Sequence, residues 1–199
     1  MTSLNDFELW QQVRQGDKDA FSTLFVRYHK RIYNYCYRSV GDWSRAEDLA
    51  SIVFLEAWRR RDIELSTETV IPWLFGIATN VIRSARRSLR RYENALTHLP
   101  TEREAVDISE EIDYAAEKDE AARTVIDLLG KLSRRDREAF RLCAWEHFTC
   151  EEAAFILDVP VGTVKSRLFR ARAKLSELYE RERTLTSKEP VSRDRAERE

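Results

Sequence analysis

Residues 163–175 combine cations with small and aromatic side chains in a pattern suited to binding nucleic acid. A helix turns by about 100° per residue, so Val164 and Leu168 share one apolar face of this segment with Ala171. The opposite face is small and mixed, and cations edge it. Such a surface fits the major groove of DNA, where guanidinium and ammonium groups meet base edges and phosphates. The residues assigned to this contact are Thr163, Lys165, Ser166, Arg167, Phe169 and Arg170.

A simpler interpretation of the same segment is a solvated basic helix, because arginine and lysine are good helix formers. An outward-facing Phe169 fits that interpretation poorly, since an exposed aromatic ring gives a solvated helix no advantage. The DNA interpretation is therefore favoured.

The preceding residues supply the elements that would position this face. Thr149 can cap a helix, and Glu152, three residues later, can complete a capping box. Asp158 and Pro160 should end that helix, because proline lacks a backbone donor and disfavours helix at its predecessor. A second helix then begins near residues 162–163. Two short helices separated by a tight turn predict a helix-turn-helix.

A second basic cluster lies in a helix predicted from Pro72 to about Arg91, because proline suits the first turn of a helix. The residues expected to face inward are Leu74, Ala78, Val81, Ala85 and Leu89. Thr79 and most of the cations lie on the outer face. Cations with an amide and an aromatic ring suit DNA strands, through phosphate contacts and base stacking; a soluble arginine face is the alternative. The residues assigned to DNA here are Trp73, Asn80, Arg83, Arg86, Arg87 and Arg90.

A helix predicted over residues 44–60 also has two distinct sides. Its buried side is expected to hold Ala46, Leu49, Ala50, Val53 and Ala57. The opposite side holds Asp48, Ser51, Ile52, Leu55 and Trp58, and it is more apolar than a solvated face requires. Ile52, Leu55 and Trp58 could bind a partner protein or pack on a neighbouring helix of the same domain. The residues themselves leave both alternatives open.

The composition predicts an all-α protein, and the motifs give no sign of an enzyme. Of 199 residues, 35% are charged, only five are glycine and four are proline, and the apolar patterns have a helical period. His29, His98 and His147 are scattered, with no phosphate loop, nucleophile elbow or zinc-protease motif nearby. The three cysteines lack metal-binding spacing. We therefore expect no cofactor and no metal.

Four segments are expected along the chain. They are a helical domain over residues 5–92, a flexible acidic linker over 93–116, a helical domain over 117–180 that ends in the helix-turn-helix, and a charged, disordered tail over 181–199. The acidic residues of the linker cancel the charge of the basic surfaces, so the net charge of the whole chain is only −1. No run approaches the roughly 18 apolar residues of a membrane span. We therefore expect a cytoplasmic protein without membrane insertion.

Two such domains resemble the extracytoplasmic-function (ECF) group of bacterial sigma factors. The similarity rests on Pro160-Val-Gly-Thr-Val-Lys-Ser-Arg-Leu-Phe-Arg-Ala-Arg, on Ala46-Glu-Asp-Leu followed by Val53-Phe-Leu and Trp58, and on Pro72-Trp-Leu with Ala78-Thr-Asn. It implies a subunit that binds core RNA polymerase, directs promoter recognition and transcription initiation, and has an anti-sigma partner. A stand-alone helix-turn-helix regulator is the alternative. It would leave Asn80 and the five arginines of the second cluster without a role, namely Arg83, Arg86, Arg87, Arg90 and Arg91.

The resemblance also implies roles for the assigned residues. Asp48, Ser51, Ile52 and Leu55 would dock on the clamp helices of the beta-prime subunit, and the C-terminal domain would contact the beta flap. The connector before Pro72, with Asn80, Arg83 and Arg87, would lie near the minus-10 promoter element. Lys165, Ser166, Phe169 and Arg170 would meet the minus-35 element.

The sequence departs from the family pattern at a few of these positions. Ser51 and Ile52 stand where many members have glutamine and an acidic residue. In the helix-turn-helix turn, Asp158 stands where members often have glycine. Aspartate tolerates a left-handed backbone better than most residues, so the turn should still form.

Overall fold

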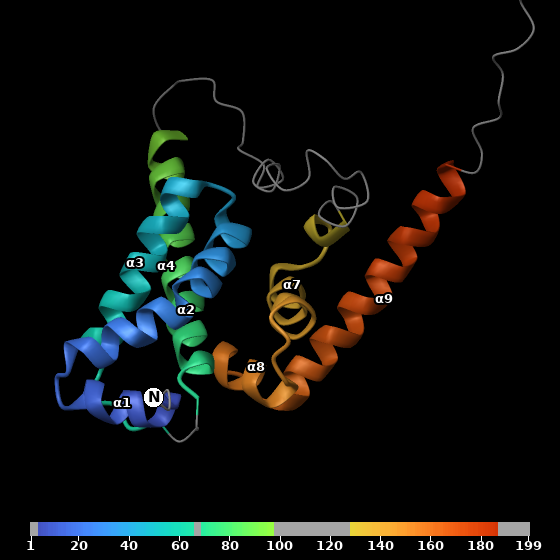
Figure 1. Ribbon diagram of the computed structural model, residues 1–199. Helices are drawn as coiled ribbons and strands as arrows, with labels where there is room; N and C mark the ends of the chain where they lie inside the picture. The colour runs from blue at the N-terminus through green and yellow to red at the C-terminus, as the bar shows by residue number, and fades with distance from the viewer. Residues whose placement is uncertain (1–3, 66–68, 98–127, 187–199) are drawn as a thin grey trace, which may run out of the picture.

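The computed structural model describes residues 4–65, 69–97 and 128–186. Each regular element in these ranges is a helix, which confirms the all-α prediction (Figure 1). None of the described helices is long and apolar enough to cross a membrane. In chain order the helices are α1 (Asp6–Arg14), α2 (Lys18–Val40), α3 (Trp43–Arg59), α4 (Ile71–Thr97), α7 (Arg134–Phe140), the π-helical turn η2 (Arg141–Trp145), α8 (Cys150–Leu157) and α9 (Val161–Thr186).

Polar caps mark the beginnings of the N-terminal helices. The Asn5 side chain accepts a hydrogen bond from the Glu8 N–H, and the Glu8 carboxylate accepts one from the Asn5 N–H, which makes a capping box for α1. Asp17 and Asp42 accept backbone N–H groups at the starts of α2 and α3. Gly41 ends α2 with a φ of 70°, a conformation that glycine adopts without strain. Short-range sequence signals therefore set these helix boundaries.

Helices α2, α3 and α4 pack side by side, and α1 crosses one end of them (Figure 1). The predicted buried side of α3 is confirmed, since Ala46, Leu49, Ala50, Val53 and Ala57 are all buried. In α4 the outcome is mixed. Leu74 and Ala78 are buried as predicted, but the prediction that Leu89 faces inward is wrong, because its side chain is exposed. The Tyr35 hydroxyl of α2 and the Thr79 hydroxyl of α4 form a buried hydrogen bond of 3.0 Å. The prediction that Thr79 lies on the outer face is wrong, because α2 covers that side of α4.

The described part of the N-terminal half covers residues 4–65 and 69–97, and that of the C-terminal half covers residues 128–186. In the C-terminal half, α7 runs directly into η2. The early part of α9 packs on α7 and α8, while its C-terminal end projects away from the rest of the molecule (Figure 1). A small apolar cluster of Leu129, Leu132 and Ala171 lies between α9 and the segment that precedes α7.

The two halves are in direct contact, which the sequence did not predict. Helix α8 packs against α4 (Figure 1). Phe75 of α4 meets Phe148 edge-on, with ring centroids 4.8 Å apart. One apolar core consequently runs through both halves and includes Trp10 at one end and Leu168 at the other.

Helices α4 and α9 are longer than predicted. α4 continues to Thr97, because no glycine or proline interrupts the chain before Pro100. α9 continues to Thr186, past the predicted boundary at residue 180, and ion pairs one turn apart support this end, such as Arg181 with Glu177 at 2.8 Å. Most of the predicted linker, from residue 98, and the tail beyond residue 186 lie outside the described residues.

Candidate nucleic-acid and partner interfaces

Helix α8, the turn after it and α9 form the predicted helix-turn-helix. The Thr149 hydroxyl accepts from the Glu152 N–H at 3.1 Å, and the Glu152 carboxylate accepts from the Thr149 N–H at 2.8 Å, so the predicted capping box is confirmed. Asp158 ends α8 with a φ of 54°, in the left-handed region. The Val159 N–H then donates to the Ala154 oxygen at 3.1 Å and closes the turn. This geometry sets the angle at which α9 leaves α8.

Helix α9 presents the expected outer face. Its predicted core positions Val164, Leu168 and Ala171 are buried. On the other side Lys165, Ser166 and Arg170 are exposed, and Phe169 is 75% exposed. An exposed aromatic ring between cations suits a DNA-binding surface, because the ring can contact a thymine methyl group while the cations meet phosphates or guanine edges.

Arg170 and Ser166 already have protein partners on this face. The Ser166 hydroxyl donates to the Thr163 oxygen at 3.0 Å, so its own oxygen remains available as an acceptor. Arg170 Nη2 lies 2.9 Å from a carboxylate oxygen of Asp136 in α7. Burial raises the pKa of Asp136, but hydrogen bonds from Ser133 and Arg170 outweigh that effect and lower the pKa overall. A ligand of the Arg170 guanidinium would therefore compete with Asp136.

Two of the assigned residues are buried. Arg167 is only 9% exposed, and its pKa is lowered, first by burial and then by the neighbouring Arg135 cation. Trp73 packs edge-on against Trp10 of α1, with ring centroids 4.8 Å apart, and belongs to the core. The structure thus places these two side chains inside the molecule and not with the open surface residues.

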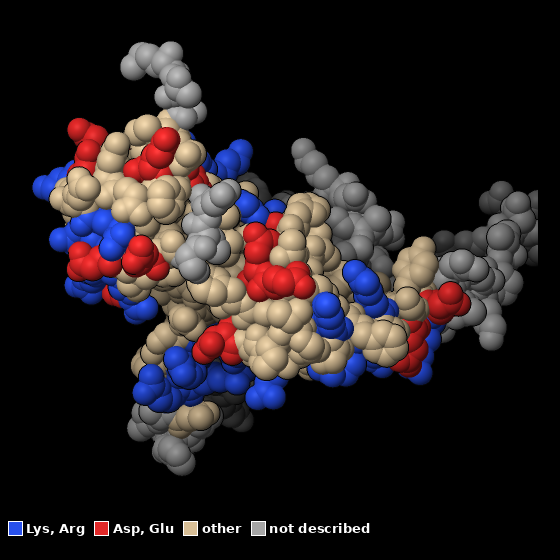
Figure 2. Space-filling view, turned by 90° about the horizontal axis from the view of Figure 1, so that it is seen from below, with Lys and Arg blue, Asp and Glu red and all other residues tan. Residues whose placement is uncertain are grey.

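The exposed part of the α4 face borders a groove of about 500 Å³ between α3 and α4. Asn80 and Arg87 line this groove together with Ile52 and Glu56 of α3. Arg90 is exposed farther along α4. In the view of Figure 2, Lys and Arg side chains gather into patches and do not cover the face evenly. The α4 groove therefore combines an amide, guanidinium groups and an apolar wall.

The other two arginines assigned to α4 are engaged in packing. Arg83 Nη2 lies 2.8 Å from Glu138 Oε2 of α7, in the other half of the chain. The Arg86 guanidinium donates to the backbone oxygen of Ser39 near the end of α2. The structure therefore separates the predicted cluster into an exposed set and a set that holds elements together.

A second carboxylate, Glu146, also joins the two halves. Its side chain is buried and lies 2.9 Å from Arg38 Nη1, while Arg31 Nη2 donates to its backbone oxygen at 2.6 Å. Arg31 also lies over the Phe148 ring, 4.9 Å from the centroid. Sequence reasoning missed Glu146 and Glu138, because their partners in the N-terminal half stand 55 to 115 residues away in the chain.

On α3 the assigned residues Asp48, Ser51, Ile52 and Leu55 are all exposed. Leu55, which is 52% exposed, lines a groove of about 490 Å³ between α2 and α3. Trp58 borders the same groove but packs on Phe21 of α2, with ring centroids 5.1 Å apart. The sequence alone left open whether this side of α3 packs on a neighbouring helix or binds a partner, and the answer differs between residues. Trp58 packs within the N-terminal half, and Ile52 and Leu55 form an open apolar surface.

Comparison with known proteins agrees with this geometry. The family model for Sigma-70 region 2 matches residues 24–92, and that for Sigma-70, region 4 matches residues 122–175. The chain is 31% identical over 178 residues to the RNA polymerase sigma-H factor of Pseudomonas aeruginosa, covering 86% of this chain and 92% of that protein. It is also 31% identical over 171 residues to the ECF RNA polymerase sigma factor SigW of Bacillus subtilis, covering 83% and 91%.

Solved structures show the same fold. CnrH in complex with the cytosolic domain of CnrY matches with a TM-score of 0.63 and 29% identity, over 88% of this chain and 97% of that one. The sigma factor RpoE in complex with the anti-sigma factor NepR from Bartonella quintana matches with a TM-score of 0.65 and 27% identity, over 82% and 98%. The chain therefore belongs to the ECF group of sigma-70 family sigma factors, the non-enzymatic subunits that direct RNA polymerase to promoters.

Proposed function

We propose that the open face of α9 reads the minus-35 promoter element through Lys165, Ser166, Phe169 and Arg170, with Thr163 at its start. The observation that carries this proposal is the exposed mixture of cations, a hydroxyl group and an aromatic ring directly after the helix-turn-helix turn. Cations pair with guanine edges or phosphates, and an aromatic ring can contact the thymine methyl group. Arg167 would support this face from beneath.

The minus-10 element lies, in this proposal, along the α4 side of the groove between α3 and α4. Asn80, Arg87 and Arg90 are exposed there and can contact bases and phosphates of a DNA strand. Arg83 and Arg86 would join them only after exchanging Glu138 and Ser39 for DNA.

The compact arrangement described above is, we infer, the state without promoter DNA. By their names the two elements are about 25 base pairs apart, which corresponds to about 85 Å of duplex at about 3.4 Å per base pair. In the compact arrangement the two halves share one core, in which Phe75 packs on Phe148. While this contact lasts, the two halves cannot reach both promoter elements at once. The C-terminal half would therefore leave α4 when the holoenzyme binds a promoter.

Core RNA polymerase is the partner proposed for the apolar surface of α3. Ile52 and Leu55, with Asp48 and Ser51 beside them, would dock on the clamp helices of the beta-prime subunit, and the C-terminal half would contact the beta flap. Two similar proteins were each solved with a protein partner. CnrH was solved with the cytosolic domain of CnrY, and RpoE from Bartonella quintana with the anti-sigma factor NepR. We propose that an anti-sigma factor likewise binds this chain, clamping across both halves in the compact arrangement.

Transcription with purified components tests these assignments. The full chain is combined with core polymerase of its host and a library of genomic fragments, and transcript starts are mapped. We expect starts that share one pair of upstream motifs. Loss of starts with Asn80→Ala, and altered preference at the upstream motif with Lys165→Ala, would support the two DNA surfaces. Tight duplex binding without polymerase, with no association with core, would instead favour a stand-alone regulator.

A further inference from the structure

We propose that Asp6 is a positioning residue for the minus-10 element, because it fixes the end of the connector that joins α3 to α4. This inference rests on the proposed function, in which the exposed face of α4 lies against minus-10 DNA. The connector covers residues 60–70, of which 60–65 and 69–70 are described.

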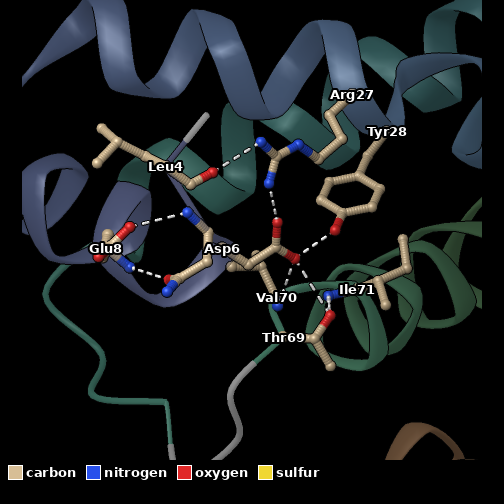
Figure 3. Close-up of polar contacts among 9 residues, drawn as sticks. Leu4, Asp6, Glu8, Arg27, Tyr28, Thr69, Val70 and Ile71 are labelled. Carbon is tan, nitrogen blue, oxygen red and sulfur yellow. Dashed lines mark hydrogen bonds and ion pairs between the residues drawn. The ribbon is translucent and has the colours of Figure 1, made fainter. Parts of the chain in front are cut away.

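The Asp6 carboxylate gathers partners from two other parts of the fold (Figure 3). One oxygen, Oδ1, accepts from the Arg27 guanidinium of α2. The other, Oδ2, accepts from the Tyr28 hydroxyl, also on α2, from the Thr69 hydroxyl at 3.2 Å and from the Val70 N–H at 3.3 Å. The side chain therefore ties α1 and α2 to the last residues before α4.

Capping of α1 does not account for this arrangement. Asn5 and Glu8 already form the capping box, with hydrogen bonds of 2.8 and 2.9 Å, and both bonds are made without Asp6. Asp6 is only 8% exposed, but its partner Arg27 is half-buried, and a partly exposed ion pair adds little net stability. What the Asp6 contacts do supply is a defined position for residues 69–70.

That position bears directly on α4. The Thr69 hydroxyl oxygen accepts from the Ile71 N–H at 3.3 Å, so the group held by Asp6 also caps the first turn of α4 (Figure 3). Asn80 lies nine residues farther on, about 14 Å along the same rigid helix at about 1.5 Å per residue. Together with the packing of α4 on α2 and α3, this cap therefore helps to fix where Asn80 and the exposed arginines lie.

The beginning of the connector has its own anchor on α1. The Trp10 indole N–H donates to the backbone oxygen of Ile63 at 3.0 Å, and the same ring packs on Trp73 of α4. Helix α1 thus holds the connector at Ile63 and again at Thr69 and Val70. Holding both ends before DNA arrives lowers the ordering cost of binding, because fewer backbone states remain to be lost.

Tyr28 contributes a lasting donor to this cluster. Burial, followed by the hydrogen bond and charge of Asp6, raises the pKa of Tyr28 to about 12. The phenol therefore keeps its proton and donates to Asp6 at any pH at which transcription is measured. Arg27 is fixed in turn, because its second terminal nitrogen donates to the Leu4 oxygen at 3.0 Å.

The test compares Asp6→Asn and Thr69→Val with the control Glu8→Gln, which weakens the α1 capping box without touching the connector. Each full-length variant is assembled with core polymerase on the promoter fragment that wild type transcribes best. Three quantities are measured: affinity for core, affinity for a duplex containing only the minus-35 region, and open-complex formation by permanganate reactivity. We expect at least about tenfold less open complex for both connector variants, the factor for losing one charge-assisted hydrogen bond. The loss should be larger for Asp6→Asn, because the amide weakens all four contacts of the carboxylate. The other two quantities should be unchanged.

The positioning role is overturned if both connector variants open the promoter as wild type does, or if Glu8→Gln lowers open-complex formation equally. A second arm separates this failure from failure of the proposed function. Asn80→Ala should lose open complex whatever the role of Asp6. If wild type opens no promoter, or if Asn80→Ala behaves as wild type, then the assignment of minus-10 DNA to α4 fails, and the inference about Asp6 fails with it.

Discussion

Arg83 of α4 and Glu138 of α7 form an ion pair, 2.8 Å between Nη2 and Oε2, that links a residue assigned to promoter DNA with the opposite half of the chain. Glu138 also lies 3.2 Å from Arg134, one turn earlier in α7. Burial raises the pKa of Glu138, but hydrogen bonds and charge from Arg83 and Arg134 outweigh burial and lower it overall. A cation proposed to bind DNA phosphate is thus neutralised internally while the two halves are in contact.

Glu138→Gln should therefore loosen the contact between the halves. The amide keeps the shape of the side chain but removes the charge that attracts Arg83, so the compact arrangement should lose about 1 kcal/mol. Fluorescence energy transfer between labels on α2 and α9 reports the separation. Asp136→Asn is the matched control, since Asp136 pairs with Arg170 within the C-terminal half. Equal changes for the two variants would show that the Arg83 pair does not hold the halves together.

The same pair predicts a pH dependence of the compact arrangement. A carboxylate whose pKa is lowered in the folded state contributes stability that is complete above its unfolded pKa and is lost as pH falls through the folded value. The contact should therefore be constant from neutral pH to about pH 5 and weaken below about pH 4.5. Energy transfer is followed between pH 7 and pH 3. The difference between wild type and Glu138→Gln isolates this carboxylate, and a flat difference would contradict the prediction.

Asp158→Gly should stabilise the protein, an unusual result for a helical region. Asp158 has a φ of 54°, where glycine is strain-free and other residues are not. We expect a gain of about 0.5 to 1 kcal/mol in the free energy of unfolding, measured by urea denaturation. Glu151→Gly, in the first turn of the same helix, should show the opposite sign at about 1 kcal/mol. A loss with Asp158→Gly would mean that the aspartate side chain contributes more than its backbone strain costs.

How far the sequence could predict this molecule depends on the distance over which each interaction acts. The Thr149 and Glu152 capping box and the left-handed Asp158 involve only near neighbours, and both were predictable. The sides of α4 were harder to assign. Thr79 is covered by Tyr35 of α2, and Phe75 by Phe148 of the other half, so their burial depends on helices placed by the whole fold.

The candidate site divides in the same way. Lys165, Ser166 and Phe169 could be assigned from helical period alone, because solvent covers the face opposite the core of α9. Arg167 and Trp73 could not be placed correctly, since α7 and α1 cover them. A long side chain at the edge of a helical face can turn either way, and only the neighbouring element decides.

Leu55→Asp should weaken binding to core polymerase without unfolding the chain. Leu55 is 52% exposed, so a charge there meets water in the free protein but a dry contact in the proposed complex. Loss of a central apolar contact should lower the affinity by about tenfold or more. Val26→Asp is the control, because Val26 is 76% exposed on α2 and lies outside the groove that Leu55 lines. A collapsed melting transition for Leu55→Asp alone would assign Leu55 to the core.

Arg170→Ala should change which promoters are used more than how well DNA is bound in general. If the guanidinium exchanges Asp136 for a base edge, its loss should cost about 1 to 3 kcal/mol on promoters with the preferred upstream sequence and little on others. Arg181→Ala, farther along α9, removes the same charge without touching the proposed reading face. Competition transcription among promoters that differ only in the minus-35 region gives the comparison. A uniform loss over all of them would make Arg170 a phosphate contact, because phosphates carry no sequence information.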